Sequence, residues 1–145
     1  MNKEKEDMKA RFYRTLLSED TERHILPLHF VSTETAEMRR RLDDVESSTF
    51  YSWTTWRIVR KTIINWVMSE KSDATFEKML AQKEEWKDYK ISFGPYKKAI
   101  GILFPMYGNS KECYRFVVKV IVHRYVDYKG KVVLDVRVKT IHPIP

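Results

Sequence analysis

Histidine and cysteine are the residue types in this sequence best able to support catalysis or metal binding. No two histidines stand at the i, i+4 spacing of a helical metal site, and Cys113 has no second cysteine to complete a zinc shell. Only Lys111 and Arg115 are near enough in sequence to lower the pKa of Cys113, so we predict a small hydrophobic residue and not a nucleophile. For His123, near Tyr125, we predict a solvated or cross-strand-stacked ring. The four histidines are His24, His29, His123 and His142.

Other signatures of catalysis do not occur in the sequence. It contains no Gly-x-Gly-x-x-Gly, Walker or Gly-x-Ser-x-Gly motif, and its four glycines are too few for phosphate loops built from backbone. Acid pairs such as Glu84-Glu85 and Asp43-Asp44 are adjacent, so their side chains diverge around a helix. We therefore predict that the protein is not an enzyme and uses no catalytic residue, metal or cofactor.

Two clusters typical of nucleic-acid-binding proteins have structural explanations as well. On a helix, each arginine of the triplet 39–41 has an acid four residues away, which favours a self-neutralised surface over an RNA-binding or nuclear-localisation signal. Residues 53–61 interleave aromatic and basic side chains, as in proteins that bind single strands. Trp53 and Trp56 fall on a helical stripe opposite Arg57 and Lys61, which favours a core position.

Positive charge is concentrated at the C-terminal end. The net charge is −2 for residues 1–48, +2 for residues 49–90 and +7 for residues 91–145, where ten Lys/Arg meet three Asp/Glu. Lysines on exposed strands often do no more than discourage aggregation between sheet edges. Ordinary solubilising surfaces mix both signs of charge, however, so an anion-binding surface is an equally good explanation of this excess of cations. The predicted anion-binding residues are Lys97, Lys98, Arg115, Lys119, Lys129, Lys131, Arg137 and Lys139.

Apolar residues on the polar side of the same strands predict a protein interface. Val117, Ile121 and Val133 share that side, which a fully solvated face would not need. We expect these residues to be covered by another chain or by a helix, because exposed apolar residues beside unpaired strand edges favour strand addition.

The pattern of apolar residues predicts a single α+β domain over residues 1–145, mainly helical over 1–90 and mainly β over 91–145. About four helices should pack on one face of a small antiparallel sheet. They carry apolar stripes of Met8, Phe12 and Leu16; of Met38, Leu42 and Val45; of Trp53, Trp56, Val59, Ile63, Trp66 and Val67; and of Phe76, Met79, Leu80, Lys83 and Trp86. The third should span about 50–69, and the fourth should begin at a Ser72 or Asp73 cap and end near Asp88.

The strands should follow the helices. Residues 89–93 and 97–104 predict two short strands, and alternation over residues 114–126 and 132–141 predicts one long hairpin. Asp127–Lys131 supplies its turn, with Gly130 available for a positive φ. The segment 25–31 contains Pro27 and is expected as an edge strand or an extended crossing.

The single cysteine and the lack of an apolar leader segment favour a reducing intracellular location, either cytoplasmic or nuclear. Apolar runs are too short for a transmembrane helix, so any contact with an anionic membrane should be peripheral.

The segment Tyr114–Val120 (YRFVVKV), followed by a lysine-glycine turn, resembles the first hairpin of Tctex-type dynein light chains and covers less than a fifth of the chain. That family has two further strands after this hairpin, which this sequence lacks, and no counterpart of the fourth predicted helix. The resemblance implies only a small adaptor.

Two functional hypotheses follow. The first is a binding protein whose basic sheet and hairpin engage a polyanion, RNA or DNA above all. The second is a small protein-protein adaptor, or a self-assembling, matrix-like subunit that forms homo-oligomers. An acidic protein surface would satisfy either hypothesis.

Overall fold

The computed structural model describes residues 2–16, 33–43 and 45–145. The predicted segment 25–31 lies outside these residues. In chain order the elements are α1 (Asn2–Leu16), α3 (Thr33–Asp43), β1 (Ser47–Phe50), α4 (Trp53–Met68), the 3-10 helix η1 (Glu70–Ser72), α5 (Asp73–Leu80), β2 (Trp86–Phe93), β3 (Gly101–Phe104), β4 (Lys111–Cys113), β5 (Arg115–Val126) and β6 (Val132–Ile144).

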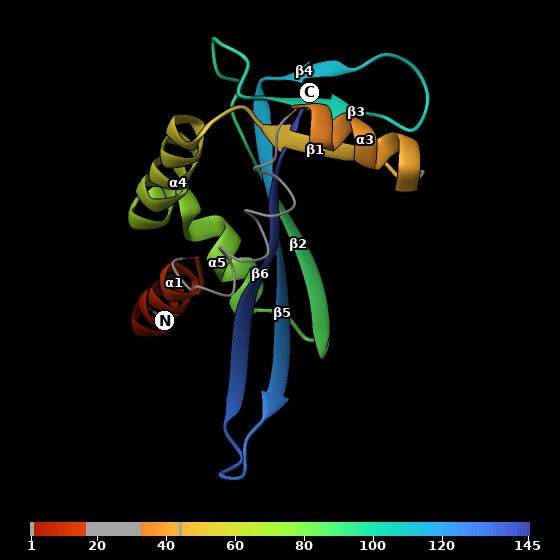
Figure 1. Cartoon of the computed structure of the whole chain (residues 1–145). Coiled ribbons are helices and arrows are strands. Elements are labelled where there is room, and N and C mark those ends of the chain that lie inside the picture. The colour runs from red at the N-terminus through yellow and green to blue at the C-terminus, as the bar shows by residue number, and fades with distance from the viewer. Residues whose placement is uncertain (1, 17–32, 44) are drawn as a thin grey trace.

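The strands form two antiparallel sheets of three strands each. Sheet A has the order β1-β3-β4, and sheet B has the order β2-β5-β6. Figure 1 shows sheet A crossing one end of sheet B, with α1, α4 and α5 together on one side. Most helical residues precede most strand residues, so the predicted α+β class is confirmed.

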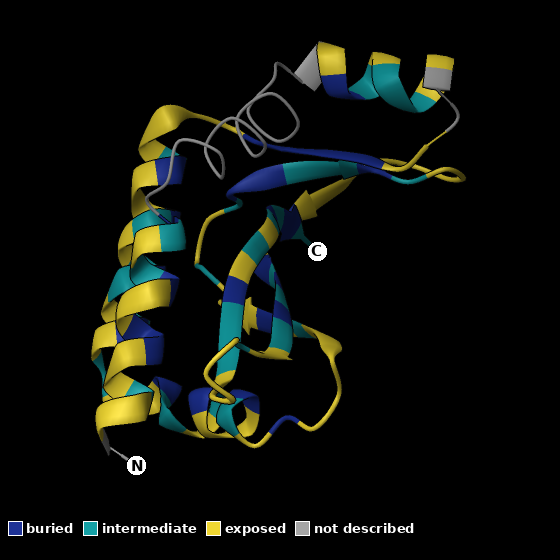
Figure 2. Cartoon of the chain, turned by 90° about the horizontal axis from the view of Figure 1, so that it is seen from below, coloured by how far each residue is buried: buried dark blue, intermediate teal, exposed yellow. Residues whose placement is uncertain are grey.

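The helices bury the apolar stripes that face the sheets. Met8, Phe12 and Leu16 of α1 are buried, as predicted. The buried residues of α4 are Trp56, Val59, Ile63 and Val67. Figure 2 shows that the long helices are buried on the side facing the sheets and exposed on the outer side. The main core therefore lies between these helices and one face of sheet B.

Two predicted apolar stripes are partly wrong. Trp53 opens α4 with its side chain 61% exposed, because it lies one turn before the first buried residue, Trp56. On α3, Met38 and Leu42 are exposed, and the buried residue is Ala36. A small residue at the contact allows α3 to lie against β1 and β3, which turns its larger side chains outward.

Several element ends also differ from the prediction. The helix expected over 50–69 begins at Trp53, because Phe50 ends β1, and the Ser52 hydroxyl caps it by accepting from the Thr55 N–H at 3.2 Å. The helix expected to reach Asp88 ends at Leu80. The next element in the chain is β2, which begins three residues before the strand predicted over 89–93. The strand expected over 97–104 is confined to β3.

The long hairpin is confirmed, and its turn is stabilised from within. The Asp127 carboxylate accepts hydrogen bonds from the N–H groups of Lys129 and Lys131, both at 2.9 Å. Gly130 has φ 78°, the left-handed conformation that favours glycine. The turn therefore holds its lysines at the far tip of sheet B.

The candidate interaction face of sheet B

One face of sheet B is turned away from the core. Strand residues alternate between two faces, and in β5 the core-facing series is Phe116, Val118, Val120 and Val122. The residues between them define what we call the open face. It consists of Trp86, Asp88, Lys90 and Ser92 of β2, Arg115, Val117, Lys119, Ile121, His123 and Tyr125 of β5, and Val133, Asp135, Arg137, Lys139, Thr140, His142 and Ile144 of β6.

Aromatic rings gather at the hairpin half of this face. Trp86 lies opposite His123, and their rings stack with centroids 3.8 Å apart and an interplanar angle of 1°. The His123 ring lies 5.0 Å from that of Tyr125. Trp86 is 55% exposed and Tyr125 41% exposed. We call these side chains the aromatic row, and they leave a large aromatic surface in contact with water. The predicted cross-strand stacking of His123 is confirmed.

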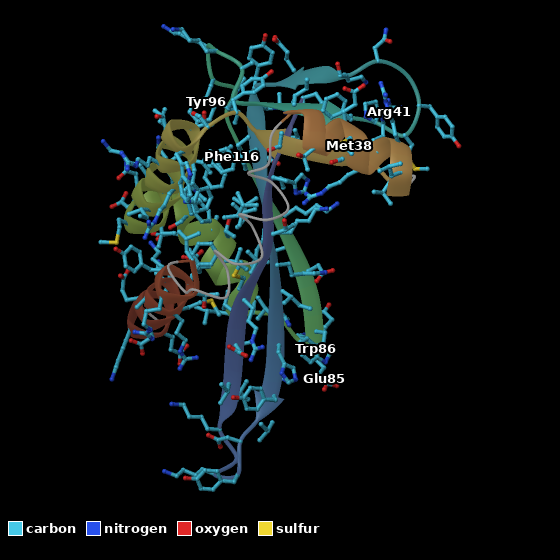
Figure 3. The ribbon with its side chains drawn as sticks, in the orientation of Figure 1. Met38, Arg41, Glu85, Trp86, Tyr96 and Phe116 are labelled. Atoms are coloured by element: carbon cyan, nitrogen blue, oxygen red, sulfur yellow. The ribbon has the colours of Figure 1, made fainter. Side chains whose placement is uncertain are left out.

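The aromatic row has an acidic neighbour. The Glu85 carboxylate lies 3.6 Å from Nε2 of His123, and the Glu85 carbonyl accepts from the Arg124 N–H at 2.7 Å. Figure 3 shows Glu85 and Trp86 at the hairpin end of β2, far from Met38 and Arg41 of α3. Backbone pairing thus positions the row on rigid strands and not on a loop.

Two of the predicted anion-binding cations have acidic partners on the open face. The Arg137 Nε lies 3.1 Å from the Asp135 carboxylate, and the Lys139 Nζ lies 3.7 Å from that of Asp88. A shift in the β5–β6 register between Lys119 and Val120 leaves Lys139 between paired positions. This part of the face carries both signs and is less basic than the sequence suggested.

Two lysines remain without a carboxylate at the centre of the open face. Lys90 and Lys119 are direct cross-strand partners. Neither makes an ion pair with a described residue. Like charges directly opposite each other destabilise a sheet, so the two ammonium groups repel each other without compensation from a described acid. The pair therefore concentrates positive charge at the centre of the open face.

The remaining predicted anion-binding residues lie apart from this centre. Arg115 donates to the Pro145 carbonyl at 3.0 Å, Lys129 and Lys131 lie at the hairpin tip, and Lys97 and Lys98 lie in the loop between β2 and β3. The twelve residues of β5 separate that loop from the tip by about 40 Å. The structure thus brings together only part of the predicted set.

The predicted interface residues also separate. Val117 is buried within the chain itself, so it offers no surface to a partner. Ile121 and Val133 are half-buried. Ile121 lies opposite Asp88 on the open face, whereas Val133 also lines a groove of about 690 Å³ between α1 and the turn end of the hairpin. These two residues contribute apolar area around the aromatic row.

Of the three ion pairs predicted for the arginine triplet, one lies within the described residues. Arg41 pairs with Glu37 at 2.6 Å, as predicted. The Nε of Arg40 is buried and has no hydrogen-bond partner in the described structure. The predicted partners of Arg39 and Arg40 involve the side chain of Asp43 and residue 44, which lie outside the described structure.

Cys113 is buried at the end of β4. Burial raises the pKa of its thiol to about 12, so the thiol stays protonated at neutral pH and is a poor nucleophile. Among the described residues, no three His, Cys, Asp or Glu side chains are placed to hold a metal ion. No helix in the described ranges is long and apolar enough to cross a membrane.

Comparisons with known proteins add one structural likeness. A chain in the crystal structure of the CdiA-CT/CdiI complex from Y. kristensenii 33638 superposes on this chain with a TM-score of 0.55. The likeness is one of fold. Sequence identity is 15%, and the match covers 88% of this chain and 100% of the other. No protein-family model matches the sequence, and no curated protein matches it.

Sequence reasoning missed the aromatic row because it placed Trp86 on a helix. The offsets from Phe76 and Met79 to Lys83 and Trp86 fit a helical repeat. The alternation of Tyr89, Ile91 and Phe93 supports the strand predicted over 89–93, but Trp86 is out of phase with it. No period-two signal in the sequence therefore extends that strand back to Trp86.

Proposed function

We propose that this protein binds a partner protein through the open face of sheet B. The aromatic row carries the proposal, because exposed tryptophan and tyrosine are enriched in protein interfaces and supply much of their binding energy. Trp86 and Tyr125 stand on paired strands, so little conformational freedom is lost when they bind.

The charges around the row support a protein partner. The pairs Arg137–Asp135 and Lys139–Asp88 form a mixed polar border, as at the rim of a protein interface. The net charge of +7 and the unpaired Lys90 and Lys119 favour an acidic partner surface, which would also accelerate association.

The structural comparison supports the same proposal. The chain with a similar fold belongs to the CdiA-CT/CdiI complex, which has two components. We propose by analogy that the present chain also works as one member of a protein pair, in a binding role without catalysis. Because its only cysteine is a free thiol, we propose an intracellular setting for this binding.

The test is capture of a partner from the lysate of the host cell by three forms of the protein. We expect W86A to weaken capture by about 30-fold, the effect of removing an interface hot spot. W53A is the matched control, because Trp53 is equally exposed but lies on α4. The proposal fails if W86A and wild type capture the same proteins equally, or if wild type captures none.

A second candidate is binding of single-stranded RNA or DNA. One observation favours it: the aromatic row lies on the same face of sheet B as Lys90 and Lys119, which have no carboxylate partner among the described residues. Stacking on rings combined with cations is how single strands are held. Each phosphate contact should lower log affinity by about 0.7 per unit of log salt.

Fluorescence anisotropy with labelled oligo(U) and oligo(dT) at several salt concentrations tests this candidate. K90A/K119A should weaken binding and reduce the salt slope, whereas K97A/K98A should change neither. Binding without catalysis further requires that the RNA is recovered intact. Cleavage of the RNA would overturn the assignment of a purely binding role.

A further inference from the structure

The two edges of sheet B differ. The edge at β6 is covered by α1, because the Arg11 guanidinium donates to the Leu134 carbonyl at 3.0 Å and the Thr15 hydroxyl to the Val136 carbonyl at 3.2 Å. The edge at β2 has no strand beside it in the described part of the chain. Figure 1 shows β2 at the margin of the molecule, on the side away from α1. Sheet B therefore has one covered edge and one open edge.

The backbone groups at the open edge follow from the pairing with β5. Because the Glu85 carbonyl bonds to the Arg124 N–H, alternate residues from Glu85 onward face β5. The residues between them turn their N–H and C=O groups to the open edge, and all of their side chains are exposed. These residues are Trp86, Asp88, Lys90 and Ser92. Such a row of unpaired groups is a template for another strand.

We propose that β2 pairs antiparallel with β2 of a second copy of this chain, about a twofold axis at Tyr89. In this register Asp88 of each copy lies opposite Lys90 of the other, and Trp86 lies opposite Ser92. The two sheets join into one, and the two open faces become continuous. The proposal is independent of the partner-protein proposal above.

Charge selects this register among the symmetric ones. A residue whose N–H and C=O groups point to the open edge must lie opposite another such residue of the second copy. This requirement restricts the position of the twofold axis. An axis at Asp88 sets two carboxylates opposite each other, and an axis at Lys90 sets two ammonium groups opposite each other, both of which destabilise a sheet. The axis at Tyr89 lies between these positions and pairs opposite charges on both sides.

The second copy also supplies what the single chain lacks. Lys90 and Lys119 face each other without a carboxylate among the described residues, and the proposed register brings a second Asp88 beside Lys90. In the single chain Asp88 pairs with Lys139 at 3.7 Å, with both side chains about half exposed or more. An exposed pair of this kind contributes little, so Asp88 is free to exchange partners.

Charge reversal at the edge tests the proposal by sedimentation over a range of concentrations. D88K and K90D should each weaken self-association by about tenfold, since each turns both symmetric pairs into repulsive ones. The double variant D88K/K90D restores opposite charges and should restore association. K139A is the control, because it removes the other partner of Asp88 without changing the edge. A wild-type monomer at every concentration overturns the proposal, as does a double variant no better than the single ones.

A disulfide tests the position of the axis. Residues facing each other across the axis are a non-hydrogen-bonded pair with Cα atoms about 4.5 Å apart, close enough for a disulfide. Y89C should therefore form a covalent dimer under mild oxidation, because Tyr89 lies opposite itself. K87C is the control, because Lys87 lies opposite Ile91. Circular dichroism should show that both variants fold. Equal cross-linking of Y89C and K87C, or none with folded Y89C, contradicts the register.

Discussion

At the residue scale, Cys113 illustrates how burial determines reactivity. Its thiol is fully buried, and the pKa is raised to about 12. At pH 8 the thiolate fraction of the native protein is then about one in ten thousand. We predict that the native protein does not react with a disulfide reagent such as DTNB within minutes, whereas protein unfolded in urea reacts with one equivalent. The exposed position of Lys111 gives the control, since C113A/K111C should react in the native state. Rapid reaction of native wild type would contradict the prediction.

The Asp73 carboxylate makes an ion pair between α5 and α1. The Lys9 ammonium, almost fully buried, lies 2.6 Å from Asp73 and 3.2 Å from the Ser69 carbonyl. The hydrogen bond from Lys9 lowers the pKa of Asp73. A lowered pKa stabilises the fold above the unfolded value of about 3.9, and this stabilisation is lost as pH falls through the folded value.

We therefore predict that D73N lowers the urea midpoint at pH 7 and that its difference from wild type shrinks below pH 4. Tryptophan fluorescence during urea unfolding at pH 7 and pH 3 provides the measurement. E77Q is the control, because Glu77 meets Lys5 at an exposed position and should change the midpoint little. A D73N effect of the same size at both pH values would show that Asp73 does not act through its charge.

At the element scale, Gly101 is the point where the two sheets meet. It lies in β3, between Phe50 of β1 and Cys113 of β4. A Cβ at this position would lie 2.5 Å from the Thr49 carbonyl oxygen and 2.9 Å from the Pro143 ring. Because backbone lies on one side and a rigid ring on the other, neither neighbour can move away easily.

G101A should therefore destabilise the protein by about 1–3 kcal/mol, the usual cost of overpacking. Chemical unfolding measures this difference in the free energy of unfolding. G130N is the matched control, because nothing lies near Gly130 and asparagine tolerates its positive φ. Equal free energies of unfolding for G101A and wild type would mean that β3 and β6 can move apart enough to admit the Cβ without cost.

Elements with one clear period could be predicted from sequence, and elements decided by distant contacts could not. The alternation in β5 and the stripe of Met8 and Phe12 identified the hairpin and α1. The end of α5 depends on Gln82, whose amide donates to the Glu84 and Val122 carbonyls, both at 3.0 Å, and accepts from the Tyr89 hydroxyl. No local pattern encodes those bonds, so the helix was predicted too long.

The same distinction applies to the candidate site. The excess of cations in the C-terminal third and the stacking of His123 could be predicted from the sequence. The pairing of Arg137 with Asp135 and of Lys139 with Asp88 could not, because strand register decides which charges meet. β1 was missed because three of its four residues, Ser47, Ser48 and Thr49, are polar and give no apolar pattern, and Phe50 was assigned to the following helix.

At the scale of the whole molecule, a chain of contacts connects the helices to both sheets. Phe12 of α1 is fully buried and lies edge-to-face with Phe76 of α5, with ring centroids 5.6 Å apart. The same helix donates hydrogen bonds to β6. The far end of β6 carries Pro143, which contacts Gly101 of sheet A. This continuity leads us to expect the two sheets to unfold together.

We predict that F12A, which removes a ring from the core beside sheet B, destabilises sheet A equally. The expected cost is about 3–5 kcal/mol, because a fully buried aromatic ring is lost. Amide hydrogen exchange measures it at Ile102 in sheet A and Val120 in sheet B, where protection should fall by the same factor. W53A provides the control, since Trp53 is exposed and should leave both amides protected. If F12A reduced protection at Val120 and left Ile102 unchanged, the sheets would be independent units, and residues 1–145 would not fold as a single domain.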